Sequence, residues 1–159
     1  MARMHLPKYL YHGTTLERAR EIDRLGYIDV ASGVTYKNLI FLADNDSYAR
    51  RVTFIKHAEQ QGDVIAVYRI HRSALKRSLV GNGDKHVSPS LSFGDTTYTY
   101  PERIAVHQEA VRVGAAPYTL RLPEGVSIVR DPKGSTGLSF TEEAAREFGI
   151  ERGMKGVIG

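Results

Sequence analysis

The stretch Tyr9–Thr14, which reads Tyr-Leu-Tyr-His-Gly-Thr, leads directly into an amphipathic segment, and this junction decides most of the fold. An apolar-aromatic run that ends in His-Gly-Thr is typical of a short buried strand. Between Leu16 and Leu25, apolar residues recur at three-residue steps with charged residues between them. We therefore expect a surface helix there, with Thr14 or Thr15 as its N-cap and Gly26 at its end.

The rest of the chain alternates short apolar runs with polar segments. We expect strands over Lys37–Asp44, Val64–Tyr68, Arg103–Val113, Tyr118–Leu122 and Val126–Val129. We expect a helix from a cap at Asp46 or Ser47 to about Gln61–Gly62, a helical turn over Ser73–Leu79, and a helix over Glu143–Phe148 introduced by Ser139 and Glu142. The polar composition of Gly81–Tyr100 indicates a long loop. Early helices and late strands favour an α+β fold.

Composition is that of one globular domain over residues 1–159, with 42% hydrophobic and 25% charged residues. The chain has no cysteine, which excludes disulfides, thiolate metal sites and a cysteine nucleophile. The histidines show no metal-binding spacing, so no metal is expected. No apolar leader or membrane-length apolar run is present, and we expect a cytoplasmic protein without a membrane partner. The net charge of +4 favours anionic partners.

Three elements in this order carry a resemblance to a known family. They are His12-Gly13-Thr14, the strand Phe41-Leu42-Ala43-Asp44, and a late strand with one carboxylate, Glu109. Together they resemble the ADP-ribosyltransferase family, with its His-Tyr-Glu-like branch as the nearest pattern. The resemblance is strongest over residues 9–113. It implies a split antiparallel β-sandwich with flanking helices, and NAD in the cleft between the sheets.

The resemblance also implies roles for individual residues. His12 is expected to contact a ribose hydroxyl of NAD, and Gly13 to offer backbone hydrogen bonds to the carboxamide, with Thr14 beside them. Phe41 stands where the family usually has a tyrosine that stacks on nicotinamide, and Ala43 follows it in the same strand. The serine and second stacking aromatic of better-known members would fall at Ala49 and Val52, so Tyr36 or Tyr48 is expected to supply the second ring.

Glu109 is the expected catalytic carboxylate, acting with His12. Cleavage of NAD passes through a ribose oxocarbenium ion, which a nearby negative charge stabilises. Alternation along Arg103–Val113 places His107 and Glu109 on one face of the expected strand. The alternative is an edge carboxylate that faces water and pairs with Arg103 or Arg112.

The resemblance implies an NAD-dependent glycosyltransferase, a mono-ADP-ribosyltransferase of toxin or effector type, with NAD as substrate. His107 replaces the Glu or Gln that some branches carry, so the macromolecular acceptor is open; nucleic acid is slightly favoured over protein, with Lys85, His86 and Arg103 as candidate phosphate contacts. A toxin role leaves room for an antitoxin or immunity partner. The alternatives are an NAD-dependent RNA 2′-phosphotransferase of the same fold and a catalytically inactive binding module.

Overall fold

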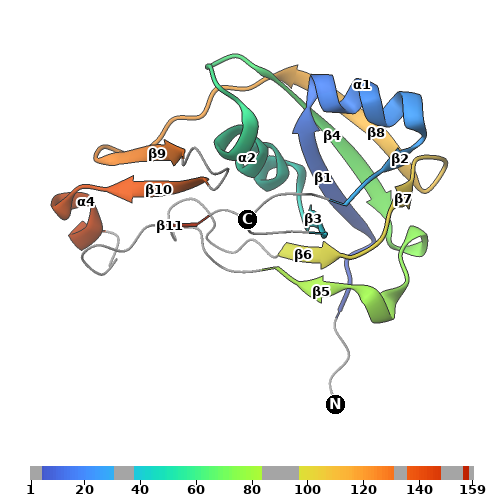
Figure 1. The fold of residues 1–159 in the computed structure, drawn as a ribbon. Coiled ribbons are helices and arrows are strands. Elements are labelled where there is room, and N and C mark those ends of the chain that lie inside the picture. The colour runs from blue at the N-terminus through green and yellow to red at the C-terminus, as the bar shows by residue number, and fades with distance from the viewer. Residues whose placement is uncertain (1–4, 31–37, 84–96, 131–135, 148–155, 158–159) are drawn as a thin grey trace.

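The fold is mixed α+β, with a six-stranded antiparallel sheet and few helices (Figure 1). It was analysed as a computed structural model that describes residues 5–30, 38–83, 97–130, 136–147 and 156–157. The strands are β1 Tyr9–Thr15, β2 Tyr27–Ile28, β3 Ile40–Ala43, β4 Val64–His71, β5 Gly81–Asn82, β6 Thr97–Tyr100, β7 Ile104–Ala105, β8 Ala110–Pro117, β9 Val126–Arg130, β10 Thr136–Phe140 and β11 Gly156–Val157. The helices are α1 Leu16–Leu25, α2 Asp46–His57 and α4 Glu142–Glu147, with 3-10 turns η1 Arg72–Ala74 and η2 Arg77–Leu79.

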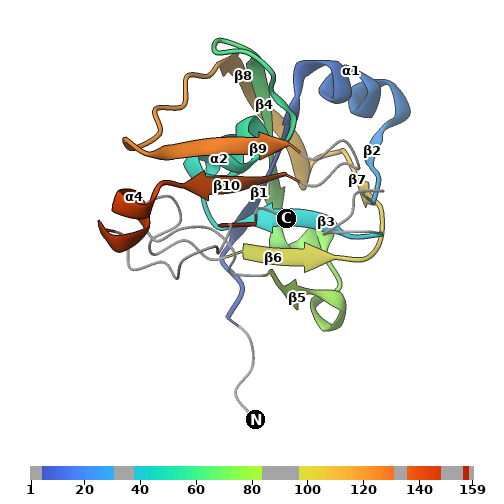
Figure 2. The ribbon, with the colours of Figure 1, turned by 60° about the vertical axis from the view of Figure 1, so that its left-hand side comes forward.

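The main sheet has the strand order β5-β6-β3-β1-β4-β8, and each neighbouring pair is antiparallel. β1 lies near its centre and pairs with β4 from Tyr9–His71 to Thr15–Ile65. On its other side, the register with β3 is set at Tyr11 and Ala43. A three-stranded sheet, β11-β10-β9, and the pair β2-β7 complete the strands of the described residues (Figure 2).

Local sequence explains the first strand and helix. The side chain of Thr15 accepts a hydrogen bond from the Arg18 backbone amide, so Thr15 caps α1. Gly26 ends the helix with φ of 82°, a left-handed conformation that glycine adopts without strain. The strand, helix, cap and stop expected from this stretch are therefore confirmed.

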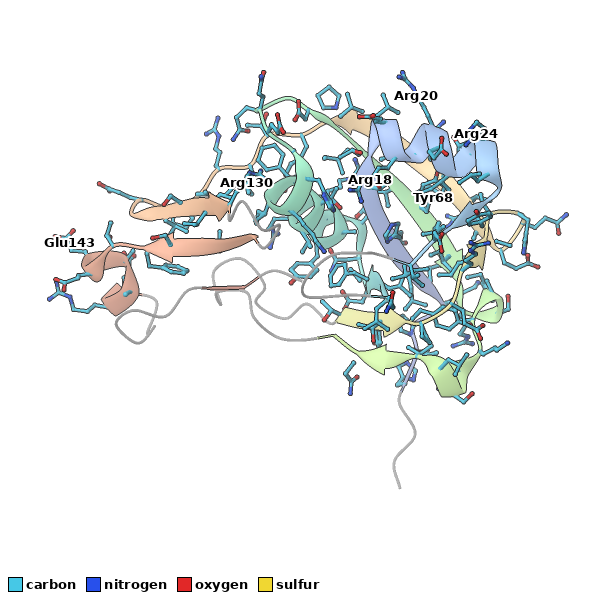
Figure 3. All side chains as sticks on the ribbon, viewed as in Figure 1. Arg18, Arg20, Arg24, Tyr68, Arg130 and Glu143 are labelled. Carbon is cyan, nitrogen blue, oxygen red and sulfur yellow. The ribbon has the colours of Figure 1, made fainter. Side chains whose placement is uncertain are left out.

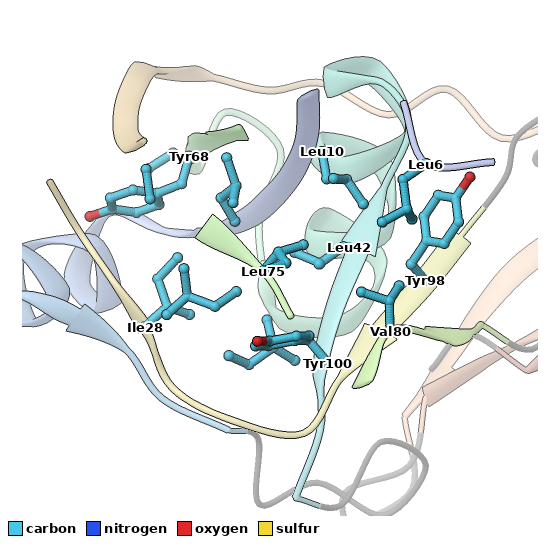
Figure 4. Packing of buried hydrophobic residues seen from close by; sticks show 14 of the residues in the cluster. Leu6, Leu10, Ile28, Leu42, Tyr68, Leu75, Val80, Tyr98 and Tyr100 are labelled. Carbon is cyan, nitrogen blue, oxygen red and sulfur yellow. The ribbon is translucent and has the colours of Figure 1, made fainter. Parts of the chain in front are cut away.

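The two faces of the main sheet are covered by different elements. Leu10, Tyr68 and Ile70 face a core that includes Ala19 of α1 and Ile28 of β2 (Figure 4). The Tyr68 hydroxyl lies 3.0 Å from the Ala19 carbonyl oxygen, which ties β4 to α1. The opposite face packs against α2, whose buried side chains join a second core with β9, β10 and α4; its members are Ala43, Tyr48, Ala49, Val52, Phe54, Ile55, Ala58, Ile65, Leu120, Val126, Leu138 and Ala144. The sheet thus separates α1 from α2.

Several expected elements have different bounds. Asn45 caps α2, and the helix ends at His57 rather than near Gly62. The expected loop Gly81–Tyr100 begins and ends in strands, β5 and β6, while Lys85 and His86 lie outside the described residues. Tyr118–Leu122 forms no strand. Thr141 caps α4, because Ser139 belongs to β10.

The expected strand Arg103–Val113 is wrong, and this correction matters for the site. The chain forms the short strand β7, reverses at residues 107–110, and only then enters β8. The amide of Ala110 donates to the carbonyl of His107 at 3.2 Å, which closes the reversal. Glu109 therefore lies in a turn and not within a strand.

Candidate functional site

A cavity of about 350 Å³ opens where β1 meets α1 and α2. It is lined by the end of β1, the inner side of α1, β2, the start of β3 and the last two turns of α2. His12, Gly13, Thr14 and Phe41, four of the residues singled out by sequence, all line it. The cavity has the volume of a typical small-molecule site, so it is the candidate functional site of the chain.

His12 is held in one orientation at the edge of this cavity. Its Nδ1 lies 2.9 Å from the Phe41 carbonyl oxygen, which can only accept, so Nδ1 carries the proton and donates. Burial lowers the pKa of His12, and the positive charges of Lys56 and Arg18 lower it further. The ring is therefore neutral near pH 7, and its Nε2 can accept a hydrogen bond from a ligand hydroxyl.

Gly13 lets α2 lie directly against β1. A Cβ at this position would stand 2.3 Å from the Thr53 hydroxyl oxygen and 2.4 Å from the Ala49 carbonyl oxygen. No side chain fits there, which explains the glycine by the packing of the helix as well as by access to a ligand. The close approach brings the last turns of α2 to the mouth of the cavity.

Positive groups gather on one side of the cavity. Arg18 comes from the first turn of α1 (Figure 3) and Lys56 from the last turn of α2, where it stands beside the neutral ring of His57. Burial and the charge of Arg18 lower the pKa of Lys56. An anion that binds between these two cations would offset their charges and stabilise the charged form of Lys56. This side of the cavity is thus suited to a phosphate-bearing ligand.

Two aromatic rings line the same cavity. Phe41 comes from β3, and Tyr27 comes from β2 with the Arg103 guanidinium 4.4 Å from its ring centre. Asp29 holds Arg103 in place through an ion pair of 3.2 Å. Among the described residues, Phe41 and Tyr27 are thus the aromatic side chains in the lining of the cavity, and Tyr48 is not part of that lining.

Glu109 is not part of this cavity, and the expected convergence of His12, Phe41 and Glu109 is not found. Glu109 lies in the turn before β8 and pairs with the Nδ1 of His107. It borders a separate depression with Tyr9 and His71. These residues lie on the sheet face opposite Leu10 and His12, since neighbouring strand residues alternate between faces.

The remaining sequence candidates among the described residues fall outside the cavity lining. Ala43 is fully buried in the core beneath α2. Tyr48 is also buried and touches Phe41 with ring centres 6.2 Å apart, so it supports that ring from behind. Tyr36 lies outside the described residues. Of the predicted positions that the structure describes, His12, Gly13, Thr14 and Phe41 meet at one place.

Sequence reasoning missed Arg18, Lys56, His57 and Tyr27. The first three carry a helical signal: Arg18 shares a helix face with Ile22 and Leu25, and Lys56 follows Val52 by one turn. Arg18 was placed among the charged residues of a surface helix, His57 was considered only as a metal ligand, and Lys56 was given no role. The spacing alone places these charges on the apolar side of each helix, where a charge is unusual.

No group of three or more histidine, aspartate or glutamate side chains suited to a metal ion occurs among the described residues. Within the same ranges, no helix combines the length and apolar character needed to span a membrane. Comparison with known protein families, with curated proteins and with solved structures yielded no match to the chain.

Replacing His57 with glutamine is expected to reduce the loss of stability at acid pH. Burial, with the charges of Arg18 and Lys56, lowers the pKa of His57 from 6.5 to about 3. Between these values the unfolded chain binds more protons than the folded chain, so stability falls as the pH drops through this window. The ring is partly exposed, and we expect a difference of about 1 kcal/mol, the free energy of about one pKa unit.

Urea unfolding of both proteins at successive pH values measures this effect. The wild-type free energy of unfolding should fall more steeply than that of His57→Gln below about pH 6.5. Parallel pH profiles for the two proteins would contradict the environment assigned to His57.

Proposed function

We propose that the cavity at His12 binds NAD and that the chain is an NAD-dependent ADP-ribosyltransferase acting on a macromolecule. The observation that carries the proposal is the meeting of a neutral, oriented His12 with Phe41 and with the cations Arg18 and Lys56 in one cavity. NAD offers a matching set of groups: ribose hydroxyls, a flat pyridinium ring and a pyrophosphate. The ADP-ribosyltransferase type of the fold, the split sandwich, is part of the same proposal.

His12 would orient the nicotinamide ribose in this scheme. Its Nε2 accepts a hydrogen bond from a ribose hydroxyl, while the Phe41 carbonyl fixes the ring through Nδ1. Phe41 offers its ring to the nicotinamide, and loss of the tyrosine hydroxyl leaves the stacking surface intact. Arg18 and Lys56 neutralise the pyrophosphate.

The carboxylate that stabilises the oxocarbenium ion must come from a residue other than Glu109. Glu21 and Asp29 are the carboxylates among the described lining residues of the cavity. Glu21 pairs with Arg24, and Asp29 with Arg103, so both are held in place by arginines at the rim. We assign the electrostatic role to one of these two.

The experiment uses NAD labelled in its nicotinamide ring, with nicotinamide release and NAD binding as separate measurements. Arg18→Gln and Lys56→Gln should each weaken NAD binding about 10-fold, through loss of a charge-assisted contact. Arg20→Gln is the matched control, because Arg20 lies on the same helix and projects from its outer side (Figure 3). Glu109→Gln should leave both measurements unchanged.

The carboxylate variants complete the test. Either Glu21→Gln or Asp29→Asn should lose nicotinamide release while NAD binding remains, because a transition-state charge contributes little to ground-state binding. If the wild-type chain binds NAD without releasing nicotinamide, the catalytically inactive binding module is the correct alternative. If it does not bind NAD, the proposal fails as a whole.

One observation favours a second candidate, the NAD-dependent RNA 2′-phosphotransferase. That activity requires basic residues and a second histidine, and the cavity joins His57, Arg18 and Lys56 to His12. The test is to incubate the chain with NAD and an RNA that carries an internal 2′-phosphate. If NAD is consumed only with this RNA and the 2′-phosphate is lost, the phosphotransferase is correct and the transferase proposal is wrong.

A further inference from the structure

The second depression of the molecule lies on the sheet face opposite His12 and has a volume of about 310 Å³. It is bordered by Tyr9 of β1, Arg69 and His71 of β4, Ser73, and the turn that carries Glu109. None of these residues takes part in the function proposed above. Their side chains form one connected group, which we call the Tyr9 face.

Tyr9 is surrounded by groups that carry or can carry positive charge. The Arg69 guanidinium lies over the Tyr9 ring at 4.7 Å from its centre, and the Lys8 ammonium at 5.4 Å. The His71 ring meets Tyr9 edge-on, with ring centres 5.4 Å apart. Tyr9 and Arg69 are held on neighbouring strands, since Tyr9 pairs with His71 and Tyr11 with Arg69.

The stacked Arg69 is a preformed plane for a nucleobase. One side of its guanidinium rests on Tyr9, which restricts the side chain before any ligand arrives. Bases that are not paired stack readily on aromatic rings and on guanidinium planes. Ring and guanidinium are both half-buried, so the platform sits within a depression that can take a base turned out of a strand.

The surroundings supply contacts for a phosphate chain. Lys8 is exposed at one end of the Tyr9 face. Arg50 of α2 lies farther along β4 than Arg69, with its Nη1 3.5 Å from the Ile65 carbonyl oxygen and its Nε 3.9 Å from the Asp46 carboxylate. The carboxylate of Glu109 borders the same depression and pairs with the Nδ1 of His107. Cations spaced along a stacking surface are the pattern of proteins that bind single strands.

We propose that the Tyr9 face binds single-stranded nucleic acid. The residues of the Tyr9 face alone support this binding. That the bound nucleic acid is the acceptor of ADP-ribose rests on the function proposed above. A duplex does not fit, because its bases are stacked within the helix and cannot reach Arg69.

Fluorescence anisotropy with a short labelled single-stranded RNA of mixed sequence tests the proposal. Arg69→Gln and Tyr9→Leu should each weaken binding about 10-fold, the size of one lost base-stacking contact. Lys8→Gln, an exposed position that leaves the fold intact, should lower affinity less and reduce the dependence of affinity on salt. Arg20→Gln, which removes the same charge from the outer side of α1, should bind as wild type.

Three results would overturn the proposal: no binding by the wild-type chain, equal loss in Arg20→Gln and Arg69→Gln, or equal affinity for a blunt duplex. Nicotinamide release from NAD without RNA is measured on the same variants and should be unchanged, because the two depressions are separate. RNA binding without NAD cleavage would refute only the transferase, and NAD cleavage without RNA binding would refute only the Tyr9 face.

Discussion

Replacing Gly13 with alanine is expected to lower the free energy of unfolding by about 3 kcal/mol, at the upper end of the usual overpacking cost. The added methyl group would lie 2.3 Å from the Thr53 hydroxyl oxygen and 2.4 Å from the Ala49 carbonyl oxygen. The carbonyl belongs to the helix backbone and cannot move alone. Thr53 donates to that same carbonyl at 2.7 Å and is buried, so it cannot turn away without breaking this bond. The whole of α2 must shift.

Urea unfolding followed by circular dichroism measures the effect. Gly114→Ala is the matched control, because Gly114 also lies in the main sheet and its Cβ would meet only the Arg50 Nη2, at 3.1 Å. A long arginine side chain can move by this amount, and we expect a change below about 1 kcal/mol there. Similar values for the two variants would refute the close packing of α2 on β1.

The second large effect concerns His12. His12→Gln should reduce nicotinamide release from NAD by roughly 10²- to 10³-fold, as removal of one oriented polar group from an active site does. The imidazole is fixed by the Phe41 carbonyl and presents Nε2 at a set position, whereas a glutamine side chain has more rotatable bonds and loses this fixed geometry. NAD affinity should change less than the rate, because Phe41, Arg18 and Lys56 remain.

His57→Gln is the control for this measurement. His57 lines the same cavity and the substitution is chemically identical, yet no contact with the Phe41 carbonyl is lost. Its effect on the rate should be much smaller than that of His12→Gln. Equal effects at both positions would show that the two histidines act as a pair and would favour the phosphotransferase chemistry.

Local patterns predicted the elements that build the first half of the site. The strand that carries His12, the helix α1 with its cap and stop, and the strand of Phe41 depend on residues close in sequence, which periodicity and capping describe well. The meeting of His12, Gly13, Thr14 and Phe41 followed because β1 and β3 are neighbours in the sheet.

Glu109 was misplaced because alternation continues through a turn that has no turn residue. None of the residues His107, Gln108 and Glu109 is a glycine, proline or asparagine, so no residue type marks the reversal closed by Ala110. The expected strand assigned Glu109 to a face by its position relative to Ala105. Because the chain reverses before Ala110, alternation from Ala105 no longer predicts the face on which a later residue lies. The faces of β8 are set by its own register with β4.

The cations of the cavity could not be placed from sequence for a different reason. Arg18 and Lys56 are far apart in the sequence, on helices that cover opposite faces of the sheet. They meet because α1 starts, and α2 ends, at the same end of β1. The proximity of these side chains depends on the strand order of the whole sheet, which local sequence patterns do not predict.

The unequal pairing of β1 has a consequence for how the native molecule opens. Seven residue pairs join β1 to β4, whereas the described register with β3 rests on Tyr11 and Ala43. We therefore expect the amide protons hydrogen-bonded between β1 and β4 to exchange last with solvent. Separation of β3, β6 and β5 from β1 should require a lower free energy of opening. The His12–Phe41 hydrogen bond joins β1 to β3 and so crosses the boundary between these two parts of the sheet. A ligand that contacts both residues would stabilise the contact between β1 and β3. Its binding would therefore slow amide hydrogen exchange in β3, β6 and β5, including at amides that the ligand does not touch.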